Sequence, residues 1–197
     1  MSREFFNQRA SIWDETAAEK DQSKLRGLVK RLRLPKGAAV LDIGSGTGVL
    51  LPFLLEAIGP NGKVFALDFA EMMLSQARRK LGSENVSFLL AEVDDIPLLS
   101  RNCDAVVCYS SFPHFPDKPQ ALSEMHRVMR TGSRLHVCHT SSRKAINRRH
   151  RSIPSVRNDV IPTEKQMRRM LAQAGFCEIS VEDSGESYLA SAMRSEF

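Results

Sequence analysis

An acidic residue and a glycine-rich loop follow the first strongly apolar run of the chain. The run "VLDIG" carries Asp42, and the loop after it is Gly44, Ser45, Gly46, Thr47, Gly48, with a glycine at every second position. Glycines let a backbone turn sharply and approach a ligand without Cβ atoms in the way. The helix expected beyond the loop has free N–H groups in its first turn. This spacing predicts a ligand site at the end of a buried strand.

The residues around the loop argue against two phosphate-binding motifs and favour a ligand with a cationic amine. The dinucleotide motif G-x-G-x-x-G needs a glycine where Val49 stands, and the G-K-[ST] ending of a P-loop is absent. Asp42 would repel a pyrophosphate but attract an ammonium group. Asp68, which ends the next apolar run, can accept from both hydroxyls of a ribose. A ribose and a cationic amine, with no phosphate needed, describe S-adenosylmethionine.

Apolar residues at helical spacing and in short apolar runs predict the helices and strands that position these residues. Helical spacing covers residues 3–33, and Thr163 could cap the last helix. The further expected elements are strands at 38–44, 64–68, 86–92, 103–110, 133–139, 176–183 and 187–194 and helices at 48–59, 70–82, 119–130 and 163–175. This order predicts an α/β fold of the Rossmann-like, doubly wound type. We expect a seven-stranded, mainly parallel sheet with a closing antiparallel hairpin and helices on both faces.

Length and composition point to one globular domain over residues 1–197. The chain is 42% hydrophobic and 26% charged, with a net charge of +5. It has no apolar run near the ~20 residues of a membrane span, and its first residues show no signal-peptide core, so a cytoplasmic location is expected. Its four cysteines have no CxxC or secreted-type spacing, which predicts reduced thiols. The oligomeric state is left open.

Five segments in order resemble the motifs of class I S-adenosylmethionine-dependent methyltransferases. They are "VLDIGSGTG", "VFALDFAEMML", "LLAEVDDIPL", "CDAVVCYSSFPHF" and "EMHRVMRTGSRLHV". Within that family the chain is most similar to the small-molecule group that includes the ubiquinone and menaquinone C-methyltransferases. The opening "FFNQRASIWDE" resembles that group's first helix. The resemblance implies a methyltransferase that uses S-adenosylmethionine and a small-molecule acceptor.

The resemblance also implies roles for individual residues. Asp42 and the loop Gly44–Gly48 would hold the methionine portion of the cofactor, and Asp68 the ribose. The remaining implied contacts are Phe69 and Met73 on the adenine face, Glu92 on the adenine amino group, the Val93 N–H on a ring nitrogen, and Tyr109 and Ser110 beside the sulfonium. Residues 1–35, with Trp13, would form a helical lid. The chain departs from the family at Thr131–Ser133, which replaces Pro-Gly-Gly, and at Cys138-His139, where an acid is common.

Methyl transfer needs a base only when the acceptor carries a proton. His114 and His139 follow the fourth and fifth strands, so either could be that base. The competing interpretations are a hydrogen bond that shapes the loop for His114 and packing for His139. His126 is expected at the surface and His136 in the core.

A basic segment and a group of soft ligands remain open to two interpretations each. Residues 140–162 are expected to form a short basic cap, in which Arg143, Arg148 and Arg149 either meet an anionic substrate or lie on a solvated helix face. Nucleic acid is not expected as a partner, because "RKAINRRHR" lacks interleaved aromatic residues. Convergence of Cys108, His114, Cys138, His139 and His150 could suit a soft metal or a thiol-containing substrate, but no zinc-type spacing is present, so no metal site is assigned.

Three function classes are compatible with these observations. The leading one is a methyltransferase that moves a methyl group to a small molecule by in-line displacement. The second is a catalytically silent module that binds or senses S-adenosylmethionine and meets a partner through the basic cap. The third, a dinucleotide-dependent oxidoreductase, is disfavoured by Val49 and Asp42.

Overall fold

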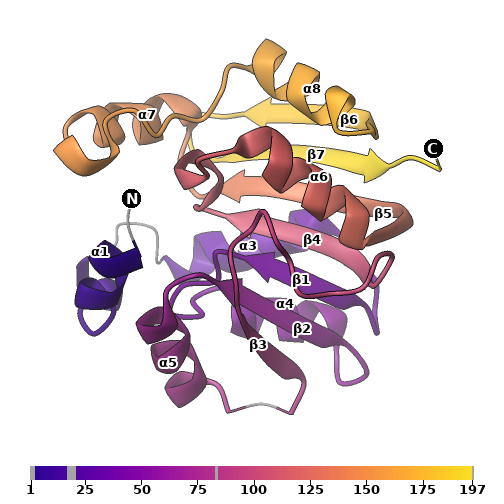
Figure 1. Ribbon diagram of the computed structural model, residues 1–197, viewed down its shortest axis with the longest axis horizontal. Helices are drawn as coiled ribbons and strands as arrows, with labels where there is room; N and C mark the ends of the chain where they lie inside the picture. Colours follow the sequence, from indigo (N-terminus) through magenta and orange to yellow (C-terminus); the bar gives the residue numbers. More distant parts are fainter. Residues whose placement is uncertain (1–2, 17–20, 83, 197) are drawn as a thin grey trace.

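A computed structural model of the protein describes residues 3–16, 21–82 and 84–196. Figure 1 shows one layer of strands between two layers of helices. In chain order the elements are α1 (Arg3–Arg9), α2 (Trp13–Thr16), α3 (Gln22–Leu32), β1 (Ala39–Ile43), α4 (Leu51–Ile58), β2 (Lys63–Asp68), α5 (Glu71–Lys80), β3 (Val86–Leu90), β4 (Cys103–Tyr109), η1 (Phe112–His114), α6 (Lys118–Val128), β5 (Met129–His139), α7 (Arg143–Arg151), η2 (Pro154–Val156), α8 (Glu164–Gln173), β6 (Phe176–Asp183) and β7 (Tyr188–Arg194).

The seven strands form one sheet in the order β3-β2-β1-β4-β5-β7-β6. Strands β1 to β5 are parallel, and β7 runs antiparallel to both of its neighbours. The predicted fold class, including the closing hairpin, is therefore confirmed. The strand order reverses between β1 and β4, and in such sheets the crevice at the carboxyl ends of the strands is the usual ligand site.

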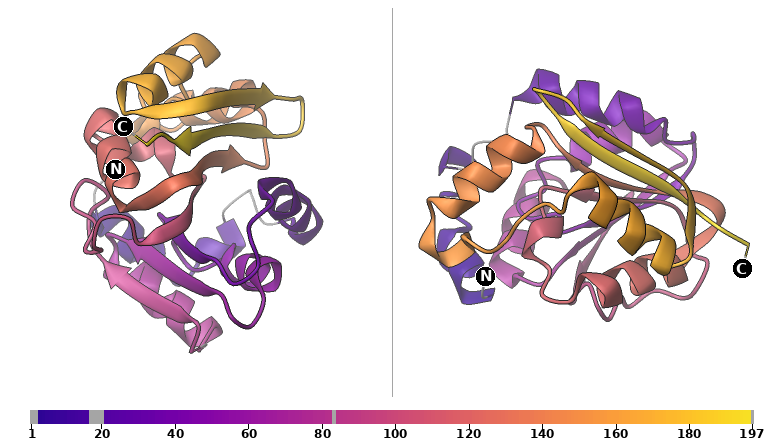
Figure 2. Two further views of the ribbon diagram at one scale, coloured as in Figure 1. Left: turned by 90° about the vertical axis from the view of Figure 1, so that its right-hand side faces the viewer. Right: turned by 90° about the horizontal axis from the view of Figure 1, so that it is seen from above.

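Two apolar clusters hold the helices to the sheet. One contains side chains of α3 and α4 together with Ala77 of α5, and the other contains side chains of α6 and α8. Figure 2 shows the sheet between α3 on one side and α6 and α8 on the other. Because both faces are covered, the central strands carry continuous apolar runs rather than alternating ones.

Local signals explain several element boundaries. Thr163 caps α8 as predicted, in a capping box with Gln166 that satisfies two otherwise unpaired N–H groups. The predicted helix at 3–33 is wrong as a continuous element, since turn residues separate α1 from α2, and its residues 17–20 lie outside the described residues. Strand β5 begins at Met129, so the last residues of the predicted helix 119–130 belong to the sheet instead.

Two further sequence expectations can be compared with the fold. Each of the four cysteines, all of them described residues, has a free thiol. Among the parts of the chain that are described, no helix is long and apolar enough to cross a bilayer.

Candidate functional site

A cleft of about 1220 Å³ opens at the carboxyl ends of β1, β2 and β4. Figure 1 shows α1 and α7 at this same end of the sheet. The cleft is lined by the glycine loop, by α1 and α2 and by α7 with η2. Fourteen of the fifteen residues proposed from the sequence for cofactor or catalysis line it: Asp42, Gly44, Ser45, Gly46, Thr47, Asp68, Phe69, Met73, Glu92, Val93, Tyr109, Ser110, His114 and His139.

The glycine loop is hydrogen-bonded to β2 and lies close to Ser111, which follows β4. The N–H groups of Gly44 and Ser45 both donate to the carbonyl oxygen of Leu67. Gly44 has φ +68°, and a Cβ there would lie 2.4 Å from the Cβ of Ser111. Gly48 is the exception among the predicted loop residues, because it packs against Ala77 of α5 rather than lining the cleft.

Two buried carboxylates lie under the loop. Asp42 is 1% exposed, and its Oδ2 atom has no hydrogen-bond partner. Asp68 accepts from the N–H groups of Gly46 and Ala70, each at 2.8 Å. Burial, followed by the charge of Asp68, raises the pKa of Asp42 to about 7. Burial also raises the pKa of Asp68 to about 6, although backbone hydrogen bonds from Ala70, Gly46 and Phe69 oppose this effect. Both carboxyl groups are therefore held where their charged forms are disfavoured, and a cationic ligand beside them would favour the charged forms.

Polar contacts fasten the N-terminal segment over this site. Asp14 accepts from the Thr47 hydroxyl at 2.5 Å and forms an ion pair with Lys80. Arg3 of α1 donates to Glu92 at 3.0 Å. The segment therefore touches both the glycine loop and the end of β3. Sequence reasoning assigned no role to Asp14, whose partners come from distant parts of the chain.

Aromatic side chains fill the space between the N-terminal segment and α5. The Phe6 ring lies 5.5 Å, between centroids, from both Trp13 and Phe69. These rings pack against Ala10 and Met73, both nearly fully buried. Phe69, Met73 and Trp13 therefore belong to one apolar cluster, and all three line the cleft.

The ends of β4 and β5 are tied together beside the loop. Ser110 Oγ lies 3.2 Å from Nδ1 of His139, and the Tyr109 hydroxyl lies 3.0 Å from that of Thr140. Ser110 has φ +55°, a backbone strain that is often found at functional sites. His139 is only 2% exposed, and its ring lies 6.3 Å from that of Tyr188.

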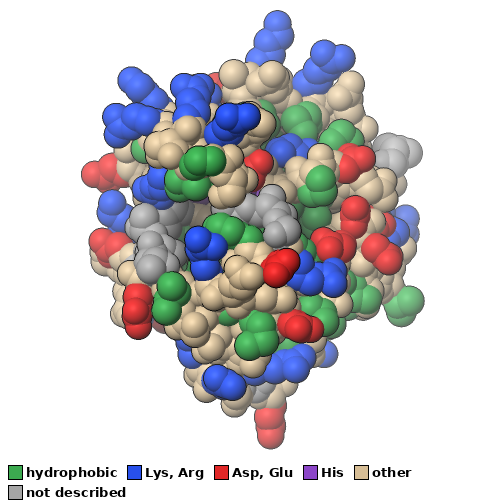
Figure 3. Space-filling view, turned by 60° about the vertical axis from the view of Figure 1, so that its left-hand side comes forward, with side chains coloured by type: hydrophobic (Ala, Val, Ile, Leu, Met, Phe, Trp, Pro, Cys, Tyr) green, Lys and Arg blue, Asp and Glu red, His purple; other side chains and the backbone are tan. Residues whose placement is uncertain are grey.

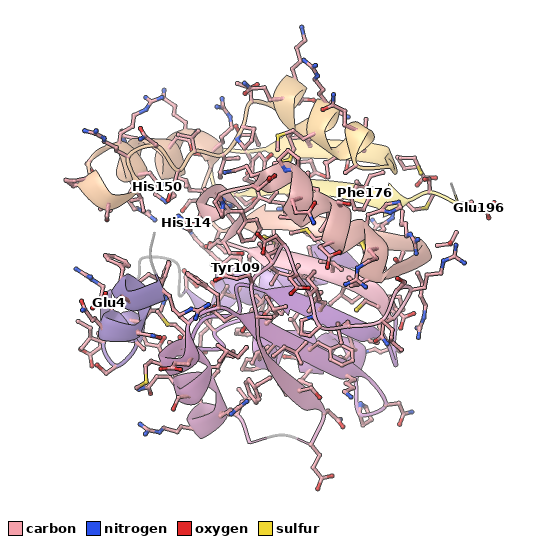
Figure 4. The ribbon with its side chains drawn as sticks, in the orientation of Figure 1. Glu4, Tyr109, His114, His150, Phe176 and Glu196 are labelled. Atoms are coloured by element: carbon pink, nitrogen blue, oxygen red, sulfur yellow. The ribbon has the colours of Figure 1, made fainter. Side chains whose placement is uncertain are left out.

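A second polar cluster lies on the other side of the cleft. His114 Nδ1 is 2.8 Å from Oδ2 of Asp159, and its ring centroid is 5.1 Å from that of His150. Figure 4 shows His114 and His150 next to each other near the gap between α1 and α7. Nδ1 of His150 donates to the backbone oxygen of Asp159. Burial lowers the pKa of His114 to about 4; the hydrogen bond to Asp159 opposes this effect, and His150 adds to it.

The three arginines of the predicted basic cap and the predicted core residue His136 lie in different surroundings. Of the three cap arginines, Arg149 lines the cleft, Arg143 pairs with Asp183, and Arg148 is exposed. Figure 3 faces this end of the molecule and shows Lys and Arg side chains gathered over its upper part, where α7 lies. His136 is buried and hydrogen-bonded to the hydroxyl of Ser191, as predicted for the core.

The prediction of His126 at the surface holds only in part, and the metal-site alternative can be compared with the described residues. His126 is partly exposed, and its ring packs on Phe176 at 5.2 Å between centroids. Within the described residues, no three His, Cys, Asp or Glu side chains are arranged to hold a metal ion.

Comparison with known proteins agrees with this geometry. The sequence pattern of the family described as "Methyltransferase domain" matches residues 34–175. A relative from Hahella chejuensis, the ubiquinone/menaquinone biosynthesis C-methyltransferase UbiE, is 34% identical over 143 residues, which are 65% of this chain and 57% of that protein. A demethylmenaquinone methyltransferase from Geobacillus stearothermophilus is 32% identical over 61% of this chain and 53% of its own length. The chain therefore spans about half the length of these curated relatives.

Solved structures extend the likeness over the whole fold. A SAM-dependent methyltransferase from Aquifex aeolicus is 25% identical, with 98% of each chain covered and a TM-score of 0.74. Phosphoethanolamine N-methyltransferase 2 from Haemonchus contortus has a TM-score of 0.81 at 14% identity, over all of this chain and 61% of that one, and shares the fold. With its family match, its sheet order and its glycine-loop cleft, the chain belongs to the methyltransferase domain family, in its S-adenosylmethionine-dependent class.

Proposed function

We propose that this protein transfers a methyl group from S-adenosylmethionine to a small-molecule acceptor that enters between α1 and α7. The observation that carries the proposal is the Oδ2 atom of Asp42, a buried carboxylate oxygen without a partner at the wall of the cleft. An unpaired buried charge is costly, so such a carboxylate implies a cation that pairs with it. The ammonium group of the methionine portion is a cation of this kind.

The other residues of the cleft fit the rest of the cofactor. Asp68 already accepts from two backbone N–H groups and retains oxygen lone pairs for ribose hydroxyls. Phe69 and Met73 supply an apolar face for adenine, beside Glu92 and Val93. Ser110 and Tyr109, at the end of β4, would border the sulfonium. We further propose that residues 1–35 act as the lid over this site.

When bound, S-adenosylmethionine supplies an already activated methyl group, and the chain's own residues align the acceptor and exclude water. Positioning of this kind can contribute roughly 7–11 kcal/mol to a displacement reaction. The Phe6–Trp13–Phe69 cluster would shield the reacting atoms from solvent on the lid side. His139, held by Ser110, is available for contact with the acceptor.

The acceptor end of the cleft favours an aromatic or other apolar compound. Phe115, Ile146, Ile153 and Val156 line it, together with Arg149 as a cation for an anionic group. The names of the two relatives from Hahella and Geobacillus make quinone-type acceptors the first to test. Thiol compounds are the second set considered from the sequence, but Cys108 and Cys138 are fully buried and do not line the cleft.

Calorimetric titration with S-adenosylmethionine and S-adenosylhomocysteine, with NADH as control, tests the cofactor. Micromolar binding of the first two alone supports the proposal, and NADH binding would contradict it. Acceptor-dependent release of S-adenosylhomocysteine then tests transfer. Tight binding without transfer to any acceptor would favour the silent binding module instead.

A further inference from the structure

The cluster of His114, Asp159 and His150 is built from three separate segments that meet at the cleft. His114 ends η1, His150 belongs to α7, and Asp159 lies between η2 and α8. Asp159 is contacted twice, at its carboxylate by His114 and at its backbone oxygen by His150. Both histidines line the cleft, and Asp159 does not. This arrangement leaves the carboxylate to act on the histidine rather than on a ligand.

The contacts decide which ring nitrogen of His114 carries the proton. A carboxylate only accepts hydrogen bonds, so the Nδ1 atom of His114 donates to Asp159. In a neutral imidazole the other nitrogen, Nε2, is then an acceptor. Burial of His114 keeps the ring neutral at physiological pH. The second ring contact, with Phe6 at 6.3 Å between centroids, fixes the ring on the lid side.

We propose that Asp159 is a positioning residue that holds His114 with Nε2 as the acceptor for a proton released by the methyl acceptor. This inference rests on the proposed function and narrows its substrate class to compounds whose reacting atom carries a proton, such as aromatic hydroxyl compounds. The proton of the acceptor passes to Nε2 of His114. The electron pair left on the reacting atom of the acceptor forms the new bond to the methyl carbon. The pair of the broken carbon–sulfur bond stays on sulfur. The positive charge lost from sulfur appears on the imidazolium, where the Asp159 carboxylate stabilises it.

The charged groups around His114 are consistent with this division of roles. Asp159 faces its Nδ1 atom, and the ring of His150 in α7 lies beside it. Burial lowers the pKa of Lys118 in α6, and the nearby charge of Asp159 opposes this effect. Lys118 is itself occupied by the carbonyl oxygens of Pro113 and Phe115. The lid contributes Arg3 and Arg9 to the same cleft, and α7 contributes Arg149, as cations that favour a phenolate-like product of proton loss.

Nitrogen-15 NMR of histidine-labelled protein tests the positioning step without cofactor. We expect neutral His114 in the Nδ1–H form, with this form lost in Asp159→Asn, because the amide can present its N–H instead. The matched control is Asp183→Asn, which removes a carboxylate paired with Arg143 at the start of the same α7. An Nε2–H form in the unmodified protein, or no change in Asp159→Asn, would overturn the proposal.

Binding of 4-nitrophenol, whose ionised form absorbs visibly, tests the proton transfer. In the complex with S-adenosylhomocysteine we expect the bound phenol to ionise at lower pH than in water. Asp159→Asn should raise that midpoint by about one to two pH units, the size of one charge-assisted hydrogen bond. His114→Gln should abolish the shift, and Asp183→Asn should keep it.

The outcomes separate this inference from the proposed function. A bound phenol that titrates as it does in water, an unchanged midpoint in Asp159→Asn, or no phenol binding overturns the inference. Failure to bind S-adenosylhomocysteine removes the proposed function instead, while the NMR experiment and the phenol titration without cofactor still judge the Asp159–His114 pair.

Discussion

Replacing Asp42 by Asn separates the effect of this carboxylate on the stability of the fold from its effect on ligand affinity. Asp42 is buried in β1 with Oδ2 unpaired, and burial and Asp68 together raise its pKa to about 7. The fold therefore disfavours the charged form of Asp42. Asparagine has nearly the same shape and carries no charge. We expect Asp42→Asn to become relatively more stable than the parent as the pH rises.

The sign and size of this change in stability follow from the shift in the pKa of Asp42. An acid whose pKa is raised by folding binds its proton more tightly in the native state, so stability is lost as the pH rises towards the folded pKa. One pKa unit corresponds to about 1.4 kcal/mol, so the two units between pH 5 and a folded pKa of about 7 are worth about 2.7 kcal/mol. The free energy of unfolding of Asp42→Asn relative to the parent should rise by roughly this amount between pH 5 and pH 8. Titrating groups distant from Asp42 cancel in the comparison.

Urea unfolding of both proteins at pH 5 and pH 8 measures this difference. A second titration at pH 8 measures affinity for S-adenosylhomocysteine, which should fall by about 1.5–3 kcal/mol, the range for a hydrogen bond to a charged group. A stability difference that is the same at both pH values would refute a buried, titrating Asp42. Unchanged affinity would refute its contact with the ligand's ammonium group.

Three further changes test other parts of the structure. Asp68→Ala leaves the N–H groups of Gly46 and Ala70 without their partner and should weaken cofactor binding by about 1.5–3 kcal/mol by calorimetry; binding as tight as in the parent would contradict the ribose assignment. His139→Ala should lower acceptor turnover with cofactor affinity near that of the parent, and unchanged turnover would leave His139 with a packing role. Thr163→Ala removes the capping box of α8 and should cost about 1 kcal/mol in urea unfolding with no effect on cofactor binding; an equal loss of binding would contradict the separation of α8 from the cleft.

The sheet and the side of the cleft formed by the glycine loop could be predicted because their signals are local. Strand β1 has an acid as its next-to-last residue, β2 ends in an acid, and the glycines between β1 and α4 indicate the turn. Parallel strands bring such ends to one edge of the sheet, so spacing along the chain translates directly into proximity. The same reasoning succeeded for Thr163, because a capping box involves only residues three apart.

Other features depend on contacts that no local pattern announces. Asp159 lies in the irregular stretch before α8, 45 positions after its partner His114. Asp14 meets Thr47 and Lys80, which are 33 and 66 positions away. The partial burial of His126 has the same origin, since its apolar neighbour Phe176 comes from a strand 50 positions later. In each case the partner is selected by the packing of the sheet, which periodicity along one segment does not reveal.

The contacts that hold the N-terminal segment bear on how a ligand reaches the cleft. Helix α1 has no buried residue of its own, and its ion pair between Arg3 and Glu92 is about half exposed at both ends. Exposed ion pairs are worth about 0–1 kcal/mol, so this contact costs little to break. Glu92 is also the residue proposed to meet adenine, and Thr47, which donates to Asp14, belongs to the loop proposed to hold methionine. If the N-terminal segment is the lid proposed above, its opening and ligand binding involve the same side chains, and ligand contacts would replace the lost contacts of Glu92 and Thr47.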